Sequence, residues 1–246
     1  MLIIPTIRLH DRMCRHVPQG AEGTDGLYPT HPEQIVRMWR GENAKALAII
    51  DENGLEQDGL GCADLVAAMT AATDIPVILF SGFRTDDDVH RSFDRLGCYR
   101  VVLPDRVCPT DRIRRLLAAF GARRIAASMH VDADANGDPV LKDIARLLAR
   151  LHDLEEAGLE RITLLVGDGS GSPPRTLLVR IVQETRLTVT LRNGVHGYSD
   201  LDVVQRLSPR RIDSLMLDDA LYGNAFPCQR IWRLAERQLL EEGRLT

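Results

Sequence analysis

A strand–turn–helix–strand unit occurs twice in this sequence, about half the chain apart. The first copy begins with the apolar run Pro76–Arg84 and the second with Leu187–Val195, and an acidic helix start follows each run. The turn glycines, Gly82 and Gly194, are separated by 112 residues in a chain of 246. A period near half the chain is too long for a solenoid repeat. It therefore indicates one fold made of two homologous halves.

Eight short runs rich in β-branched and apolar residues recur along the chain and alternate with segments of helical periodicity. These runs are Leu2–Leu9, Ala46–Asp51, Pro76–Ser81, Arg100–Leu103, Ile125–Val131, Ile162–Val166, Leu187–Arg192 and Ser214–Asp218. Strands that are apolar on both faces and separated by helices predict a parallel sheet covered by helices. The sequence thus predicts a single (β/α)8 TIM-barrel domain over residues 1–246, with half-barrels of roughly 1–121 and 122–246.

Signals for individual helices are present between the runs. Thr85, with Asp88 three residues later, predicts a capped helix start, and Gly97 provides a stop. Thr110 and Gly121 frame the next helix. These boundaries agree with the alternation of strands and helices.

Composition excludes several classes of partner. The chain has 31 Lys and Arg against 35 Asp and Glu, a formal net charge of −4, and lacks the basic stripe of a nucleic-acid-binding protein. No stretch approaches the roughly eighteen apolar residues of a membrane span, and the N-terminus does not resemble a signal peptide. The five cysteines lack the spacing of a zinc site or disulfide framework. We expect a cytoplasmic protein without metal, cofactor, nucleic-acid or membrane partners; a protein partner is left open.

A family resemblance follows from several short motifs taken in order. They are Ile3-Ile4-Pro5, Gln19-Gly20, Ile49-Ile50-Asp51, Gly82-Phe83, Gly194-Val195 and Ala220-Leu221-Tyr222 before Phe226. Together they resemble the phosphoribosyl isomerase of histidine biosynthesis (HisA) and its cyclase relative (HisF) over essentially the whole chain. The resemblance implies an aminoaldose-to-aminoketose rearrangement of a substrate with two phosphates, catalysed by carboxylates at the carboxyl ends of barrel strands.

The chain departs from that family at the implied acid–base positions. Arg8 stands where the resemblance implies an aspartate on the first strand, and a guanidinium does not release a proton near neutral pH. His130 stands at the end of the fifth strand, where it is either a structural histidine or a near-neutral base in place of a carboxylate. Asp168 matches the sixth-strand aspartate only in a gapped alignment. These three are the candidate catalytic residues.

The turns that the resemblance assigns to phosphate are altered as well. Phosphate sites use backbone N–H groups of glycine turns, and each turn here keeps one glycine where the family has two. The second turn of each half carries carboxylates, such as Asp105 and Asp218, which repel a phosphate. The candidate ligand-binding residues are Asp51, Ser81, Gly82, Arg192, Asn193, Gly194, Asp218 and Asp219.

Two interpretations apply to the arginines at the strand ends. Arg8 and Arg192 either pair with Asp51, Asp218 or Asp219 as an ion-pair network. Alternatively, an arginine fork receives a carboxylate or phosphate in a new orientation. Both interpretations stay open on the sequence alone.

The loop from Asp132 to Asp143 has carboxylates at the spacing of a calcium loop. Pro139 and an aspartate in place of the final glutamate favour instead an Asn-Gly turn at the rim of the barrel. We therefore expect no metal site there.

Two hypotheses about function follow from these departures. The first is a divergent paralogue that has lost the family isomerisation and binds a protein, or binds or acts on a small polar or phosphorylated metabolite. The second is an active isomerase in which His130 and Asp168 replace the usual carboxylates.

Overall fold

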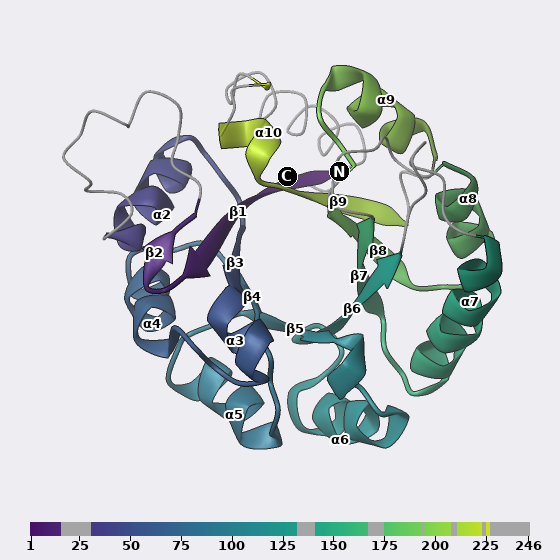
Figure 1. Cartoon of the computed structure of the whole chain (residues 1–246), viewed down its shortest axis with the longest axis horizontal. Coiled ribbons are helices and arrows are strands. Elements are labelled where there is room, and N and C mark those ends of the chain that lie inside the picture. Colours follow the sequence, from purple (N-terminus) through teal and green to yellow (C-terminus); the bar gives the residue numbers. More distant parts are fainter. Residues whose placement is uncertain are drawn as a thin grey trace. The chain divides into compact units, whose positions relative to one another are not determined.

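Eight parallel strands alternate with helices along the chain, as Figure 1 shows. The computed structural model describes residues 1–15, 31–131, 141–166, 175–192, 194–207, 211–222 and 225–226. Hydrogen-bonding order along the sheet follows the chain, and the first strand also pairs with the last. This is the topology of a (β/α)8 barrel, so the predicted fold class is confirmed.

All eight predicted strands are present, with ends that shift by at most two residues. They are β1 (Leu2–His10), β3 (Leu47–Asp51), β4 (Val77–Phe80), β5 (Arg100–Pro104), β6 (Ile125–Val131), β7 (Arg161–Val166), β8 (Thr188–Arg192) and β9 (Ile212–Leu217). A further strand, β2 (Met13–Cys14), pairs antiparallel with β1 through a turn in which Asp11 and Arg12 have φ of 48° and 62°. Two residues are too few to show a period, so this hairpin was not predicted.

The helices follow the strands in order. They are α2 (Pro32–Gly41), α3 (Glu52–Gln57), α4 (Ala63–Ala71), α5 (Asp86–Asp94), η1 (Asp105–Val107), α6 (Thr110–Phe120), α7 (Leu141–Glu156), α8 (Arg175–Glu184), α9 (Tyr198–Leu207) and α10 (Asp219–Tyr222). The predicted cap of α5 is confirmed, because the Thr85 hydroxyl accepts from the Asp88 amide and the Asp88 carboxylate accepts from the Thr85 amide. Helix α6 ends where predicted, at Gly121 with φ of 80°.

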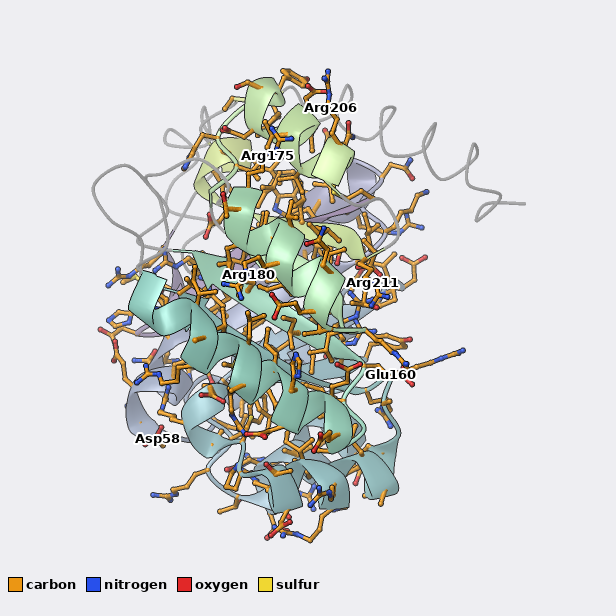
Figure 2. All side chains as sticks on the ribbon, turned by 90° about the vertical axis from the view of Figure 1, so that its right-hand side faces the viewer. Asp58, Glu160, Arg175, Arg180, Arg206 and Arg211 are labelled. Atoms are coloured by element: carbon orange, nitrogen blue, oxygen red, sulfur yellow. The ribbon has the colours of Figure 1, made fainter. Side chains whose placement is uncertain are left out.

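Two compact units are distinguished within the chain. The β1 unit comprises residues 2–103 with the described residues from 217 onward, and the β6 unit comprises Met1 with the described part of 104–216. In the β6 unit, α8 lies between α7 and α9, as Figure 2 shows. The single-domain assignment and the half-barrel boundaries stay predictions.

Strand register in the β6 unit places two rows of side chains on one face, the first polar throughout and the second alternately polar and apolar. One row is Ser128, Thr163, Thr190 and Ser214, and the next, nearer the carboxyl ends, is His130, Leu165, Arg192 and Met216. On the opposite face Met129, Leu164, Leu191 and Leu215 are buried and apolar, as expected for the side that helices cover. The two rows therefore lie on the face turned away from the helices, and the second row lies at the edge where barrel active sites are built.

Candidate functional site

Two predicted site residues lie at the same level in the β6 unit. His130 pairs in register with Leu165 of β7, which pairs in turn with Arg192 of β8. Adjacent strands are about 4.8 Å apart, so the two backbones lie roughly 10 Å apart on one face of the sheet. His130 is exposed and Arg192 is 8 % exposed. The register thus brings a histidine and a mostly buried guanidinium to the carboxyl edge together.

Arg192 has an unusual environment for a charged side chain. Its buried Nε hydrogen has no acceptor among the described residues, although the side chain makes other interactions. Burying a guanidinium is costly unless its charge is compensated. Both interpretations of Arg192, the ion-pair network and the arginine fork that receives a ligand, stay predictions.

A pocket of about 350 Å³ opens beside the end of β6. Its lining residues are Asp105, Met129, His130, Val131, Arg146, Leu147 and Arg150. Arg150 donates from Nε to Asp105 Oδ1 at 2.8 Å and from Nη2 to the Cys108 carbonyl. Asp105, predicted to repel phosphate, is therefore neutralised by an arginine of α7. Sequence analysis missed Arg146 and Arg150, although their four-residue spacing puts them on one face of a helix.

In the β1 unit Arg8 forms an ion pair with a residue that sequence analysis did not consider. Its Nε and Nη2 lie 2.6 and 2.5 Å from Glu52 Oε1, and Arg15 Nε lies 3.1 Å from Glu52 Oε2. The Glu52 side chain is only 12 % exposed, so this carboxylate is held between two guanidiniums in a partly buried site. The predicted pairing of Arg8 with Asp51 is wrong, because Asp51 pairs in register with Leu9 and so lies on the opposite face of the sheet.

Asp51 is fully buried at the end of β3, where it connects three backbone segments. Its carboxylate accepts hydrogen bonds from the Gly54 amide at 3.0 Å, the Gly61 amide at 2.7 Å and the Ser81 hydroxyl at 2.8 Å. The first bond caps α3, since Asp51 is the N-cap residue. Two predicted ligand-binding residues, Asp51 and Ser81, are thus brought together, and they bond to each other.

Gly82 packs against the loop that follows α3. Its amide donates to the Gly59 carbonyl at 2.9 Å. A Cβ at Gly82 would lie 2.2 Å from the Gly54 oxygen and 2.3 Å from the Gly59 nitrogen, so only glycine fits without a backbone shift. The N–H that a phosphate-binding turn would offer is therefore used within the protein. The ligand-binding role of Ser81 and Gly82 stays a prediction.

The remaining predicted site residues are placed as follows. Gly194 follows β8 with φ of 75°, and Asp218 follows β9 and is half-buried. Asp168, Asn193 and most of the Asp132–Asp143 loop lie outside the described residues, and the side chains of Asp143 and Asp219 are not described. Among the described side chains, no group of three or more His, Cys, Asp or Glu is arranged to hold a metal ion.

Three cysteines are buried and are poorly suited to act as nucleophiles. Burial raises the pKa of Cys14 and of Cys108 to about 12 and that of Cys62 to about 11, with smaller contributions from nearby carboxylates. Thiols with such pKa values stay protonated at neutral pH and react slowly. In the described part of the chain, no helix is both long and apolar enough to cross a membrane.

Comparison with known proteins extends over the whole barrel. A family model described as "Histidine biosynthesis protein" matches residues 2–227, which include every strand from β1 to β9. The chain belongs to this histidine biosynthesis family. The family resemblance predicted from the motifs is confirmed.

Relatives of this chain share about 30 % of its residues. A protein of Salinibacter ruber (strain DSM 13855 / M31) is 30 % identical over 98 % of this chain and 95 % of its own length. One from Chlorobium luteolum is 31 % identical over 94 % and 93 %, and one from Chloroherpeton thalassium is 27 % identical over 97 % and 93 %. Each is named 1-(5-phosphoribosyl)-5-((5-phosphoribosylamino)methylideneamino)imidazole-4-carboxamide isomerase. The expected loss of the family reaction stays a prediction, and these names favour the alternative.

Proposed function

We propose that this chain is an isomerase that converts a phosphorylated aminoaldose into an aminoketose, with His130 as the proton-transferring group. The observation that carries the proposal is the position of His130, which is exposed at the carboxyl end of β6 in a barrel whose relatives are named isomerases. Barrel enzymes build their active sites at this end of the strands. The substrate class is that of the relatives' names, a 5-phosphoribosylamino compound.

The reaction requires protons to be moved at two stages. An acid first protonates the ring oxygen of the aminoribose, so that the ring opens to a protonated imine. A base then removes the proton from C2, which gives an enaminol; C1 gains a proton as the 2-hydroxyl loses its own and becomes the ketone. Imidazole can accept the C2 proton and return it as imidazolium near neutral pH. Both carbons belong to one molecule, so no oxidant or reductant is consumed.

Arg8 does not take part in these proton transfers. A guanidinium stays protonated in proteins, and this one is paired with Glu52 at 2.5 to 2.6 Å. The acid step therefore falls to His130 itself or to Asp168, which lies outside the described residues. This makes His130 the residue on which the proposal can be tested most directly.

A second candidate is a paralogue that binds a phosphorylated metabolite without converting it. Two observations favour it: the Arg8–Glu52 ion pair stands where the family resemblance implies a free carboxylate, and the Gly82 amide is already bonded to Gly59. Each removes a group that the implied reaction would use. Binding through Arg192 and the pocket beside His130 would not require either group.

One assay separates the two candidates. The full chain is incubated with the bisphosphorylated aminoaldose of the relatives, and the new C1 methylene and ketone of the product are followed by NMR. We expect turnover that His130→Asn lowers by about a hundredfold or more. His152→Asn, at an exposed position of α7, is the matched control and should leave turnover unchanged.

The contrary outcomes are specific. No product together with saturable binding by calorimetry would support the second candidate and overturn the first. Neither product nor binding would overturn both. Turnover that His130→Asn leaves intact would remove His130 from the reaction.

A further inference from the structure

The described residues that line the pocket beside β6 include more arginines than carboxylates. Two of its lining side chains are arginines of α7, four residues apart, and its only lining carboxylate among the described residues is Asp105. Arg150 pairs with that carboxylate through Nε at 2.8 Å, so one positive and one negative charge cancel. Arg146 is exposed, and no ion pair joins it to a described side chain. Among the described arginines that line the pocket, Arg146 is therefore the one whose charge no described carboxylate compensates.

The same pocket has an apolar wall. Met129 and Val131 line it from β6 and Leu147 from α7, and all three side chains are buried for the most part. An apolar wall lowers the local dielectric constant, which strengthens the attraction between a guanidinium and an anion. The volume of about 350 Å³ lies at the lower end of the range of small-molecule sites.

We propose that this pocket binds a small organic anion, with the acidic group on Arg146 and the apolar part against Met129, Val131 and Leu147. Arg150 holds the wall in place, because its bonds to Asp105 and to the Cys108 carbonyl tie α7 to the segment after β5. A carboxylate and a phosphate monoester both fit a guanidinium fork, so the shared chemistry is an oxyanion on a small apolar body.

This site differs from the phosphate sites that the family resemblance implies. Those are backbone turns after strands, whereas this one is made by side chains of β6 and α7. The proposal does not depend on the isomerase activity, because binding is measured without turnover. Failure of either proposal therefore leaves the other standing.

The test uses the full chain with its methionine methyl groups labelled with ¹³C. Phenyl phosphate and benzoate are the two anionic probes, and phenol is the neutral one. The Met129 methyl signal, assigned with Met129→Leu, should shift and saturate with either anion and respond at least about tenfold more weakly to phenol. Raising the salt concentration should weaken binding of both anions, because charge attraction at an exposed arginine is screened.

Arg146→Gln tests the residue that carries the charge, and Arg180→Gln is its matched control. Arg180 lies on the neighbouring helix α8 (Figure 2), is half-buried with a side chain 43 % exposed, and donates from Nε to Glu184 Oε1 one helical turn away at 2.9 Å. Arg146→Gln should weaken the anions at least about tenfold, while Arg180→Gln should not. Equal affinity in Arg146→Gln, equal response to phenol, or no shift of the Met129 signal would each overturn the proposal. A preference between the two anions assigns the oxyanion as phosphate or carboxylate.

Discussion

At the scale of single residues, Asp51 shows how a strand-end carboxylate can serve structure. It accepts from the Gly54 and Gly61 amides and from the Ser81 hydroxyl, and it is fully buried. Asp51→Ala leaves those donors without this acceptor, which should lower the free energy of unfolding by about 3 to 5 kcal/mol. Asp51→Asn retains one acceptor oxygen but places an amide donor among donors, so we expect roughly half that loss. Urea unfolding measures both values.

Glu56→Gln is the control for this pair of variants. Glu56 lies five residues away and its side chain is 63 % exposed, so the substitution should change stability by less than about 0.5 kcal/mol. If Asp51→Asn instead folds as stably as the original chain and loses metabolite binding, Asp51 acts as a ligand-binding residue. That result would contradict the structural role.

The residue scale also shows what the sequence could and could not predict. The sequence shows an arginine, Arg8, near the end of the first predicted strand and a carboxylate, Asp51, at the end of the next. Whether they meet depends on register, because a shift of one residue moves a side chain to the other face. Here Arg8 pairs with Ile50 and Asp51 with Leu9, so Arg8 contacts Glu52 instead. No local pattern in the sequence specifies that register.

At the scale of elements, one tyrosine connects the last described helix to two distant segments of the β1 unit. The Tyr222 hydroxyl of α10 accepts from Trp39 Nε1 at 3.2 Å and donates to the Thr6 carbonyl at 3.0 Å. The Trp39 and Tyr222 rings meet edge to face, with centroids 5.5 Å apart. Tyr222→Phe keeps the ring contact and removes both bonds inside a buried site. We expect a loss of about 1 to 3 kcal/mol in unfolding free energy and a change in Trp39 fluorescence.

Tyr99→Phe controls for removal of a hydroxyl. Tyr99 is 43 % exposed, so water replaces any bond that its hydroxyl loses, and stability should stay within about 0.5 kcal/mol. A Tyr222→Phe variant as stable as the original chain would mean that the two bonds contribute nothing to holding α10.

Of the three scales, the sequence was most informative about secondary-structure elements. Strands buried on both faces give long apolar runs, and the Thr85–Asp88 cap is a local pattern of four residues, so both were predicted. Helix α3 was not, because its six residues include Gly54 and follow β3 without a turn signal. Its start is capped by Asp51, whose other carboxylate oxygen accepts from the Gly61 amide in the loop after α3, a contact that no local pattern specifies.

At the scale of the whole molecule, buried thiols make stability depend on pH. In the folded chain burial raises the pKa of Cys14 and Cys108 to about 12 and that of Cys62 to about 11, from an ordinary value of 9.0. Between pH 9 and these values the folded state keeps protons that the unfolded state has lost. The unfolded state then binds fewer protons, so stability falls as pH rises. The contribution of the thiols is fully present below pH 9.

We therefore expect the urea midpoint of unfolding to fall steadily from about pH 9 upward. Other groups titrate in this range, so the informative quantity is the difference between the original chain and a variant. Cys108→Ser removes one of the three thiols and keeps a donor for the Pro104 carbonyl, which Cys108 Sγ contacts at 3.2 Å. The three thiols contribute to the fall of the unfolding free energy with pH, and in the variant this contribution should be about a third smaller, whatever its stability at pH 7. An unchanged slope would mean that Cys108 titrates in the folded chain as it does in the unfolded one.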